Sequence, residues 1–386
     1  MPMPYFCYAK AGNPIRYDTV ILNSFQDLCT IALVITYTNT IFFILPSPFT
    51  KNEEIMRKLL LLTVLLAAFG IMIYGCGKSG GKGKATNKGK ISIAVIPKGT
   101  THEFWKSIHA GAVKAGRELG VEIIWKGPLK EDDREQQIKV VENFVTRGVD
   151  GIVLAPLDDR ALVACVHDAV DRKIPVVIID SDLKSERYAS FVATDNYKGG
   201  VLGAQHLGKL LGGKGKVILM RYAEGSASTT QREAGFLDTI KKEFPGIEVV
   251  SSNQYGGATA ESSYKRAENL LLRFKDVDGI FCPNESTSFG MLRALQTIGK
   301  AGKIRFVGFD SSEKLAEALR KGEIQALVMQ HPFQMGYLGV KTMVQALRGE
   351  KVEKRVDTGC EVITPENMDT PEKKELLLPD LSKWLE

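Results

Sequence analysis

Short apolar runs alternate with longer amphipathic stretches from residue 91 onward, and this alternation constrains the fold more than any other feature of the chain. The stretches between the runs carry apolar residues at helical spacing. Strands that alternate with helices form parallel sheets with helices on both faces. We therefore predict an α/β protein of two lobes, each built on a doubly wound parallel sheet. The predicted strands are residues 91–96, 121–125, 151–154, 176–179 and 191–193 in one lobe, and 217–220, 247–250, 279–281, 306–309 and 326–329 in the other.

The residues that directly follow these runs are candidate site residues. In open α/β sheets, ligands bind beyond the carboxyl ends of the strands. Polar side chains that fix hydroxyl groups, together with aromatic faces that cover the C–H side of a ring, are what a carbohydrate pocket requires. Both kinds of residue occur at these places. The candidates are Lys98, Phe104, Trp105, Asp180, Tyr222, Arg232, Asn284, Asp310 and Gln330.

Each candidate also has a purely structural interpretation. Asn284 and Asp310 are residue types that commonly cap the helices predicted after them. Lys98 would suit an exposed rim, and Trp105 would suit the core. The recurrence of such residues at one structural position in both halves favours a shared pocket.

Residues 56–75 have the pattern of a signal peptide. Met56 is followed by two basic residues, a largely apolar run to residue 73, and a small residue at position 75 before Cys76. With cysteine at the cleavage point, the pattern predicts a lipoprotein whose first mature residue, Cys76, carries the lipid. Tyr74 is bulkier than this pattern usually has. The alternative, a retained transmembrane helix, is disfavoured because the run is shorter than the roughly 20 apolar residues that span a bilayer.

The segments on either side of the signal peptide are predicted to lie outside the folded domain. Residues 1–55 are expected to be an untranslated or non-structural extension, with Met56 as the native start. Residues 76–90, rich in glycine and lysine, are expected to form a flexible linker.

Charge and cysteine content exclude several classes of partner. The formal net charge is +6, but five lysines and no acidic residue lie between residues 76 and 90, and residues 91–386 are balanced. A nucleic-acid partner is therefore not predicted. The six cysteines form no CxxC pair, the five histidines share no metal-ligand spacing, and no Gly-x-Ser-x-Gly motif occurs. Neither a metal, a cofactor nor a catalytic residue is predicted.

Several segments resemble the ribose-type (type I) periplasmic sugar-binding proteins, the substrate-binding lipoproteins of ABC transporters. The likeness is collinear and covers about residue 90 to residue 386. The segments that carry it are Thr-His-Glu-Phe-Trp at 101–105, Ile-Ile-Asp at 178–180, Ala-Thr-Asp-Asn-Tyr-Lys-Gly-Gly at 193–200, Pro-Asn-Glu at 283–285, Leu-Arg-Ala-Leu-Gln at 292–296 and Val-Gly-Phe-Asp at 307–310.

The resemblance implies two lobes joined by a three-segment hinge near residues 194–195, 330–331 and 358–359. The N-terminal lobe would comprise residues 91–194 plus 331–358, and the C-terminal lobe residues 195–330 plus 359–386. It also implies roles for the candidates: Phe104 and Trp105 as ring-stacking aromatics, Asp180 and Asp310 as hydroxyl-binding carboxylates, Arg232 as the binding arginine, and Asn284 and Gln330 as binding amides.

Three residues depart from the ribose-binding pattern. Lys98 stands where ribose binders have a small hydroxyl residue, Ala155 replaces an asparagine, and Ser181 replaces an arginine. The ligand can therefore differ from ribose, and a sugar acid, an amino-polyol or a furanone-type signal molecule are open alternatives.

The predicted function follows from the resemblance and the export signal. We expect a monomer, lipid-anchored to a membrane in the periplasm or at the outer cell surface, that captures a monosaccharide or related polyol and delivers it to an ABC importer permease. A receptor that signals through a chemotaxis or sensor-kinase partner is the alternative, because both partners would read the closed form. A sugar-responsive repressor is disfavoured, since an export signal and a spacer occupy the place of its DNA-binding helices.

Overall fold

The computed structural model describes residues 35–37, 40–42 and 90–385, in two units, Met1–Lys84 and Ala85–Glu386. In the first unit, β1 (Ile35–Tyr37) pairs antiparallel with β2 (Thr40–Phe42). The predicted signal peptide, Cys76 and all but the last residue of the predicted linker lie outside the described residues. Among the described residues, no helix combines the length and the apolarity needed to cross a bilayer.

The N-terminal lobe is a six-stranded, entirely parallel sheet with the order β13-β7-β6-β5-β3-β4. Successive side chains of a strand point to opposite faces: Ile93 and Val95 belong to the core under α2 and α10, whereas Ala94 and Ile96 belong to the core under α3 and α4. The elements of this lobe are β3 (Ser92–Ile96), α2 (Glu103–Leu119), β4 (Glu122–Trp125), α3 (Arg134–Arg147), β5 (Gly151–Leu154), α4 (Val163–Asp171), β6 (Val176–Ile179), β7 (Ser190–Ala193), α10 (Pro332–Leu347) and β13 (Arg355–Asp357).

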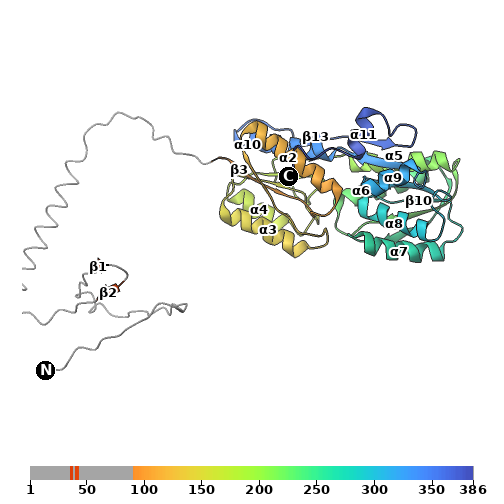
Figure 1. Ribbon diagram of the computed structural model, residues 1–386, viewed down its shortest axis with the longest axis horizontal. Helices are drawn as coiled ribbons and strands as arrows, with labels where there is room; N and C mark the ends of the chain where they lie inside the picture. The colour runs from red at the N-terminus through yellow and green to blue at the C-terminus, as the bar shows by residue number, and fades with distance from the viewer. Residues whose placement is uncertain (1–34, 38–39, 43–89, 386) are drawn as a thin grey trace, which may run out of the picture. The chain divides into compact units, whose positions relative to one another are not determined.

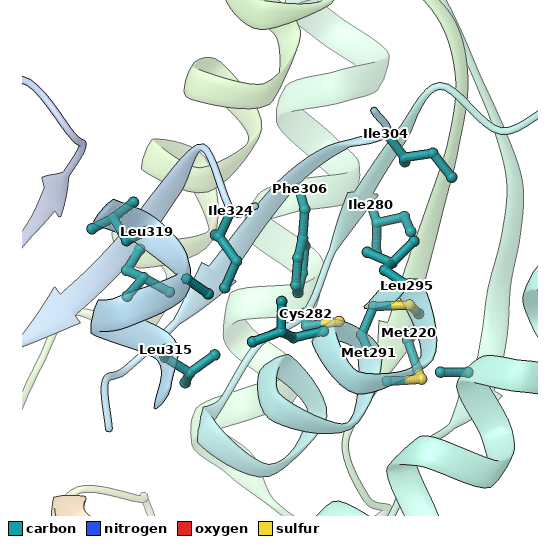
Figure 2. Packing of buried hydrophobic residues seen from close by; sticks show 14 of the residues in the cluster. Met220, Ile280, Cys282, Met291, Leu295, Ile304, Phe306, Leu315, Leu319 and Ile324 are labelled. Carbon is teal, nitrogen blue, oxygen red and sulfur yellow. The ribbon is translucent and has the colours of Figure 1, made fainter. Parts of the chain in front are cut away.

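The C-terminal lobe repeats this plan beside the first lobe (Figure 1), with the strand order β14-β12-β11-β10-β8-β9. Its strands are parallel except β14, which pairs antiparallel with β12. Figure 2 shows Phe306, Ile280 and Met291 packed in the core of this lobe. The elements are α5 (Asn196–Leu210), β8 (Lys214–Arg221), α6 (Ala227–Glu243), β9 (Gly246–Tyr255), α7 (Ala260–Arg273), β10 (Gly279–Phe281), α8 (Glu285–Thr297), β11 (Arg305–Phe309), α9 (Glu313–Arg320), β12 (Ala326–Gln330), β14 (Cys360–Ile363) and α11 (Pro371–Leu377).

The chain passes between the lobes three times, as the resemblance implied. The crossings follow β7, β12 and β13, because α5, α10 and β14 each belong to the other lobe. Two crossings lie side by side: Thr194 Oγ1 donates to the carbonyl oxygen of Gly359 at 3.2 Å. This arrangement confirms the predicted fold class of two parallel-sheet lobes with a three-segment connection.

The C-terminal tail contacts both lobes. Leu377 of α11 packs into the core of the C-terminal lobe. Beyond α11, the Arg117 guanidinium of α2 donates to the carbonyl oxygen of Lys383 at 2.9 Å and lies 5.5 Å from the ring centre of Trp384. The sequence assigned residues 359–386 to the C-terminal lobe and left open whether the tail after Glu361 also lies across the other lobe; in the structure, Lys383 and Trp384 contact Arg117 of the N-terminal lobe.

Candidate functional site

A cavity with about 310 Å³ of empty space lies between the two lobes. Part of this space is open to solvent. All nine candidate site residues line it, and five further residues complete its wall. The nine are Lys98, Phe104, Trp105, Asp180, Tyr222, Arg232, Asn284, Asp310 and Gln330; the five are His102, Glu131, Ser228, Thr229 and Glu285.

Asp180 and Asp310 occupy equivalent places in the two lobes, directly after β6 and β11. Both have left-handed backbone conformations, with φ of 60° and 64°. Aspartate tolerates this region better than most residues, although it still carries some strain. Such strain persists only where the surrounding structure enforces it, and it is commonest at functional sites. Both side chains are buried, at 3% and 5% exposure.

Lys98 is buried and contacts side chains of both lobes. Its Nζ lies 2.8 Å from Asp180 Oδ2, although the two atoms are not aligned for a hydrogen bond, and it donates to Ser228 Oγ at 3.0 Å. Asp180 belongs to the same lobe and Ser228 to the other. Lys98 is therefore a buried cation whose counter-charge is Asp180, and the alternative interpretation as an exposed rim charge does not hold.

Arg232 is buried and held from several sides. Its Nε donates to Asn196 Oδ1 at 2.8 Å, its Nη1 donates to the carbonyl oxygen of Pro283 at 2.9 Å, and the guanidinium lies 4.0 Å from the ring centre of Phe309. Asp310 Oδ2 lies 3.8 Å from Nη1. These contacts fix the plane of the guanidinium, which Arg232 needs to present its remaining donors in one direction.

Three buried polar atoms of the cavity lining have no hydrogen-bond partner among the described residues: Arg232 Nη2, Gln330 Oε1 and Asp180 Oδ2, which has only its ionic contact with Lys98. The other end of the Gln330 amide donates to Asp310 Oδ1 at 2.8 Å, which orients it. A buried polar group without a partner costs about 1–3 kcal/mol. A free donor and a free acceptor beside two carboxylates match hydroxyl groups, which both donate and accept.

Asn284 lines the cavity, but its amide is used within the C-terminal lobe. Its Oδ1 accepts from Thr287 Oγ1 at 2.6 Å and caps α8, and its Nδ2 donates to Ser286 Oγ at 3.1 Å. The capping interpretation therefore holds for Asn284. It does not hold for Asp310, because the cap of α9 is Ser312.

The two predicted aromatic residues form one corner of the cavity. Phe104 and Trp105 meet edge to face, with ring centres 5.0 Å apart. Trp105 Nε1 donates to Glu131 Oε1 at 2.5 Å. Since its polar atom is satisfied by Glu131, Trp105 is fixed as a wall.

Sequence reasoning missed a buried network around Glu131. Its Oε1 lies 2.6 Å from His102 Nδ1, and its Oε2 accepts from the Tyr222 hydroxyl at 2.6 Å. Burial disfavours the charged form of His102, but the charge and hydrogen bond of Glu131 outweigh burial and raise the pKa of His102 to about 9. Burial also opposes ionisation of Glu131, yet His102 and Lys98 lower its pKa to about 2. Tyr222 could be predicted from the sequence because it directly follows a strand. Glu131 lies in a loop, and no sequence pattern pointed to it.

The departures from the ribose-binding pattern have different outcomes. Ala155 does not line the cavity; its carbonyl oxygen accepts from Gln137 Nε2 at 2.8 Å. Ser181 does not line it either, and its hydroxyl contacts Ser228 of the other lobe. Lys98 alone of the three borders the cavity.

The lobes meet across the cavity through direct side-chain contacts. Tyr222 of the C-terminal lobe donates to Glu131 of the N-terminal lobe, and Glu285 accepts from the backbone N–H of Phe104 at 3.3 Å. These contacts describe a closed state of two lobes around a cavity lined by buried polar side chains. The fold and the site together define a two-lobed solute-binding protein.

Residues 93–351 match the family described as periplasmic binding protein domain, which covers more than half of the chain. The chain belongs to this family, whose members are exported binding proteins of the periplasm. The ribose-type resemblance is thereby confirmed.

Similar proteins share this plan over nearly their whole length. The D-ribose/D-allose-binding protein of Pseudomonas aeruginosa is 29% identical over 71% of this chain and 89% of its own. An ABC transporter solute binding protein from Agrobacterium vitis with bound D-fucose is 40% identical with a TM-score of 0.71, over 74% of this chain and 99% of its own. A carbohydrate transporter solute binding protein from Agrobacterium radiobacter, in complex with D-arabinose, is 34% identical with a TM-score of 0.73, over 75% and 99%.

Proposed function

We propose that this protein captures a neutral monosaccharide outside the cytoplasm and delivers it to the permease of an ABC importer. The observation that carries the proposal is the free donor Arg232 Nη2 and the free acceptor Gln330 Oε1 in a buried cavity that also holds Asp180 and Asp310. The sugars named for similar proteins, D-ribose, D-allose, D-fucose and D-arabinose, support the same class of ligand.

The charges of the cavity favour a neutral sugar over a sugar acid. Lys98 faces Asp180, Arg232 faces Asp310, and His102 faces Glu131. The remaining carboxyl, Glu285, has its pKa raised to about 7, because burial outweighs the attraction of His102 and Asp310 adds repulsion. No cation of the lining is left over to balance a ligand carboxylate, and an unpaired buried charge is costly.

The predicted residues have distinct roles in this proposal. Asp180 and Asp310 accept hydrogen bonds from sugar hydroxyls, and Arg232 and Gln330 supply the free donor and acceptor. Phe104 and Trp105 cover the apolar side of the ring. Lys98 holds Asp180, and Asn284 forms the wall at the start of α8.

Membrane attachment belongs to the same proposal. Cleavage before Cys76 and lipidation of that residue would tether the protein to a membrane, with residues 76–90 as the spacer. The tethered protein would act as a monomer, since one chain contains both halves of the cavity.

A thermal-shift screen of the purified protein against monosaccharides, polyols and sugar acids tests the proposed ligand class. Neutral aldoses such as D-fucose, D-arabinose, D-ribose and D-allose are expected to raise the melting temperature, because a ligand that binds only the folded state stabilises it. The corresponding sugar acids are expected to have little effect. Stabilisation by sugar acids and not by neutral sugars would overturn the proposal.

The affinity for the sugar is expected to fall as the pH rises from 5.5 to 8. In separated lobes the Glu285 carboxyl would be in solvent with an ordinary pKa, whereas closure buries it and raises its pKa to about 7. A group whose pKa rises on closure favours closure below its open-state pKa, and this contribution is lost as the pH rises through about 7. The slope is at most about tenfold per pH unit for one proton.

Calorimetric titration with the best-bound sugar across this pH range checks the prediction, with Glu285→Gln as the matched variant. Glutamine keeps an acceptor for Phe104 N–H but cannot ionise, so its pH slope should be clearly smaller. In the closed state the pKa of His102 is about 9 and that of Glu131 about 2, and burial raises the pKa of Asp310; both proteins retain these three groups, so the comparison isolates Glu285. Equal slopes in the two proteins would remove Glu285 as the cause.

A further inference from the structure

Helices α2 and α6 begin at the cavity and lack a cap from their own N-cap residues. Helix α2 follows β3 and helix α6 follows β8, and each of these strands is the first of its sheet along the chain. Neither His102 before α2 nor Ser226 before α6 makes a side-chain capping bond, whereas Asp133, Asp195 and Thr259 cap α3, α5 and α7. The first N–H groups of a helix have no partner inside the helix, so they need one from elsewhere.

The opposite lobe supplies these partners. Ser181 of the N-terminal lobe accepts through its hydroxyl oxygen from the backbone N–H of Ser228, the second residue of α6, at 3.1 Å. Glu285 of the C-terminal lobe accepts from the backbone N–H of Phe104 at 3.3 Å, with Glu103 N at 3.5 Å. The two contacts are reciprocal: each lobe caps the cavity helix of the other.

Ser181 is dedicated to this contact. Its side chain is completely buried, and it does not line the cavity, so it is not available to a ligand. Its partner Ser228 is bound a second time, because the Ser228 hydroxyl accepts from Lys98 Nζ at 3.0 Å. Two of the residues that depart from the ribose-binding pattern, Lys98 and Ser181, thus converge on the start of α6.

We propose that Ser181 and Glu285 are positioning residues for lobe closure, each completing the first turn of the opposite lobe's cavity helix only when the lobes are together. The helices that gain these caps carry cavity residues, Phe104 and Trp105 on α2 and Arg232 on α6. Closure therefore orders the segments that present these side chains. The inference rests on the proposed function in one respect: it assumes that the lobes close to retain a bound ligand.

Ser181→Ala tests the proposal, with Thr259→Ala as the matched control. Thr259 caps α7 within one lobe, by accepting from Ser262 N at 3.1 Å. This cap is therefore present in the open and the closed state alike. With D-fucose, D-arabinose and D-allose as probes, Ser181→Ala should weaken binding about two- to thirtyfold, the range of a lost helix cap, mainly through faster dissociation. It should leave the melting temperature of the ligand-free protein nearly unchanged. Thr259→Ala should do the opposite, lowering the melting temperature and leaving affinity intact.

Energy transfer between fluorophores on the two lobes measures the fraction of closed protein, which a purely local role of Ser181 would leave unchanged. Labels at Lys139→Cys and Lys242→Cys occupy exposed positions, one on each lobe. Ser181→Ala should lower the closed fraction, with and without sugar, relative to the parent and to Thr259→Ala. An unchanged closed fraction, or an affinity equal to the parent's, overturns the inference. If no sugar bound the parent protein, the proposed function would fail, and the closed fraction without sugar would still decide the role of Ser181.

Discussion

Asp310→Asn is expected to lower the affinity for the sugar about a hundredfold, because each hydrogen bond to a charged group contributes about 1.5–3 kcal/mol and Asp310 is proposed to make more than one. Asparagine keeps the size of the side chain. It also tolerates the left-handed backbone at this position, where φ is 64°. Its NH₂ group cannot accept a hydrogen bond from a sugar hydroxyl, whereas its remaining oxygen can still accept from Gln330 Nε2. The change therefore removes the charge and one of the two acceptor oxygens without changing the turn.

Calorimetric titration checks the loss of affinity, and thermal unfolding of the ligand-free protein is the control. The melting temperature should also fall, because the substitution leaves the buried Arg232 guanidinium without its counter-charge, but the protein should remain folded because asparagine keeps the size of the side chain and one acceptor oxygen. Binding within threefold of the parent would show that Asp310 does not contact the ligand.

Arg232→Ala is expected to lower the free energy of unfolding by about 3–5 kcal/mol, the usual cost of removing one partner of a buried ion pair, and also to abolish sugar binding. The substitution leaves Asp310 without its cation and Asn196 Oδ1 and the Pro283 carbonyl without their donor. It also removes the guanidinium from the ring of Phe309. Denaturant unfolding of the ligand-free protein measures the effect.

The double variant Arg232→Ala with Asp310→Asn separates the charge from the packing. If the unpaired carboxylate is the main cause, adding Asp310→Asn should restore part of the lost stability, which a double-mutant cycle reports as coupling. A loss below about 1 kcal/mol in the single variant would contradict the buried-pair interpretation.

The sequence predicted ten of the twelve strands of the two lobes, because each contains a short, nearly uninterrupted apolar run. It missed β13 and β14, which lie at the sheet edges, are three and four residues long and are only partly buried. Edge strands of this kind need little apolar surface, so periodicity does not reveal them. The tail beyond α11 is likewise placed by contacts with Arg117, which lies far away in the sequence.

The site was predictable where it follows from the geometry of one sheet, and not where it depends on two lobes meeting. Asp180 and Asp310 follow strands and Gln330 is the last residue of β12, and the carboxyl ends of parallel strands point to one edge. Glu131 lies in a loop and reaches the cavity through partners on both lobes, His102 and Tyr222. An asparagine at position 284 could either bind a ligand or cap a helix, and only the contacts of its amide show that it caps α8.

Small-angle X-ray scattering, recorded without sugar and with a saturating amount of the best-bound sugar, tests most directly whether two lobes close on one neutral monosaccharide. We expect the radius of gyration to decrease on addition of the sugar, and we expect Asp310→Asn at the same sugar concentration to show less contraction. A saturated protein with an unchanged radius of gyration would contradict closure around the ligand.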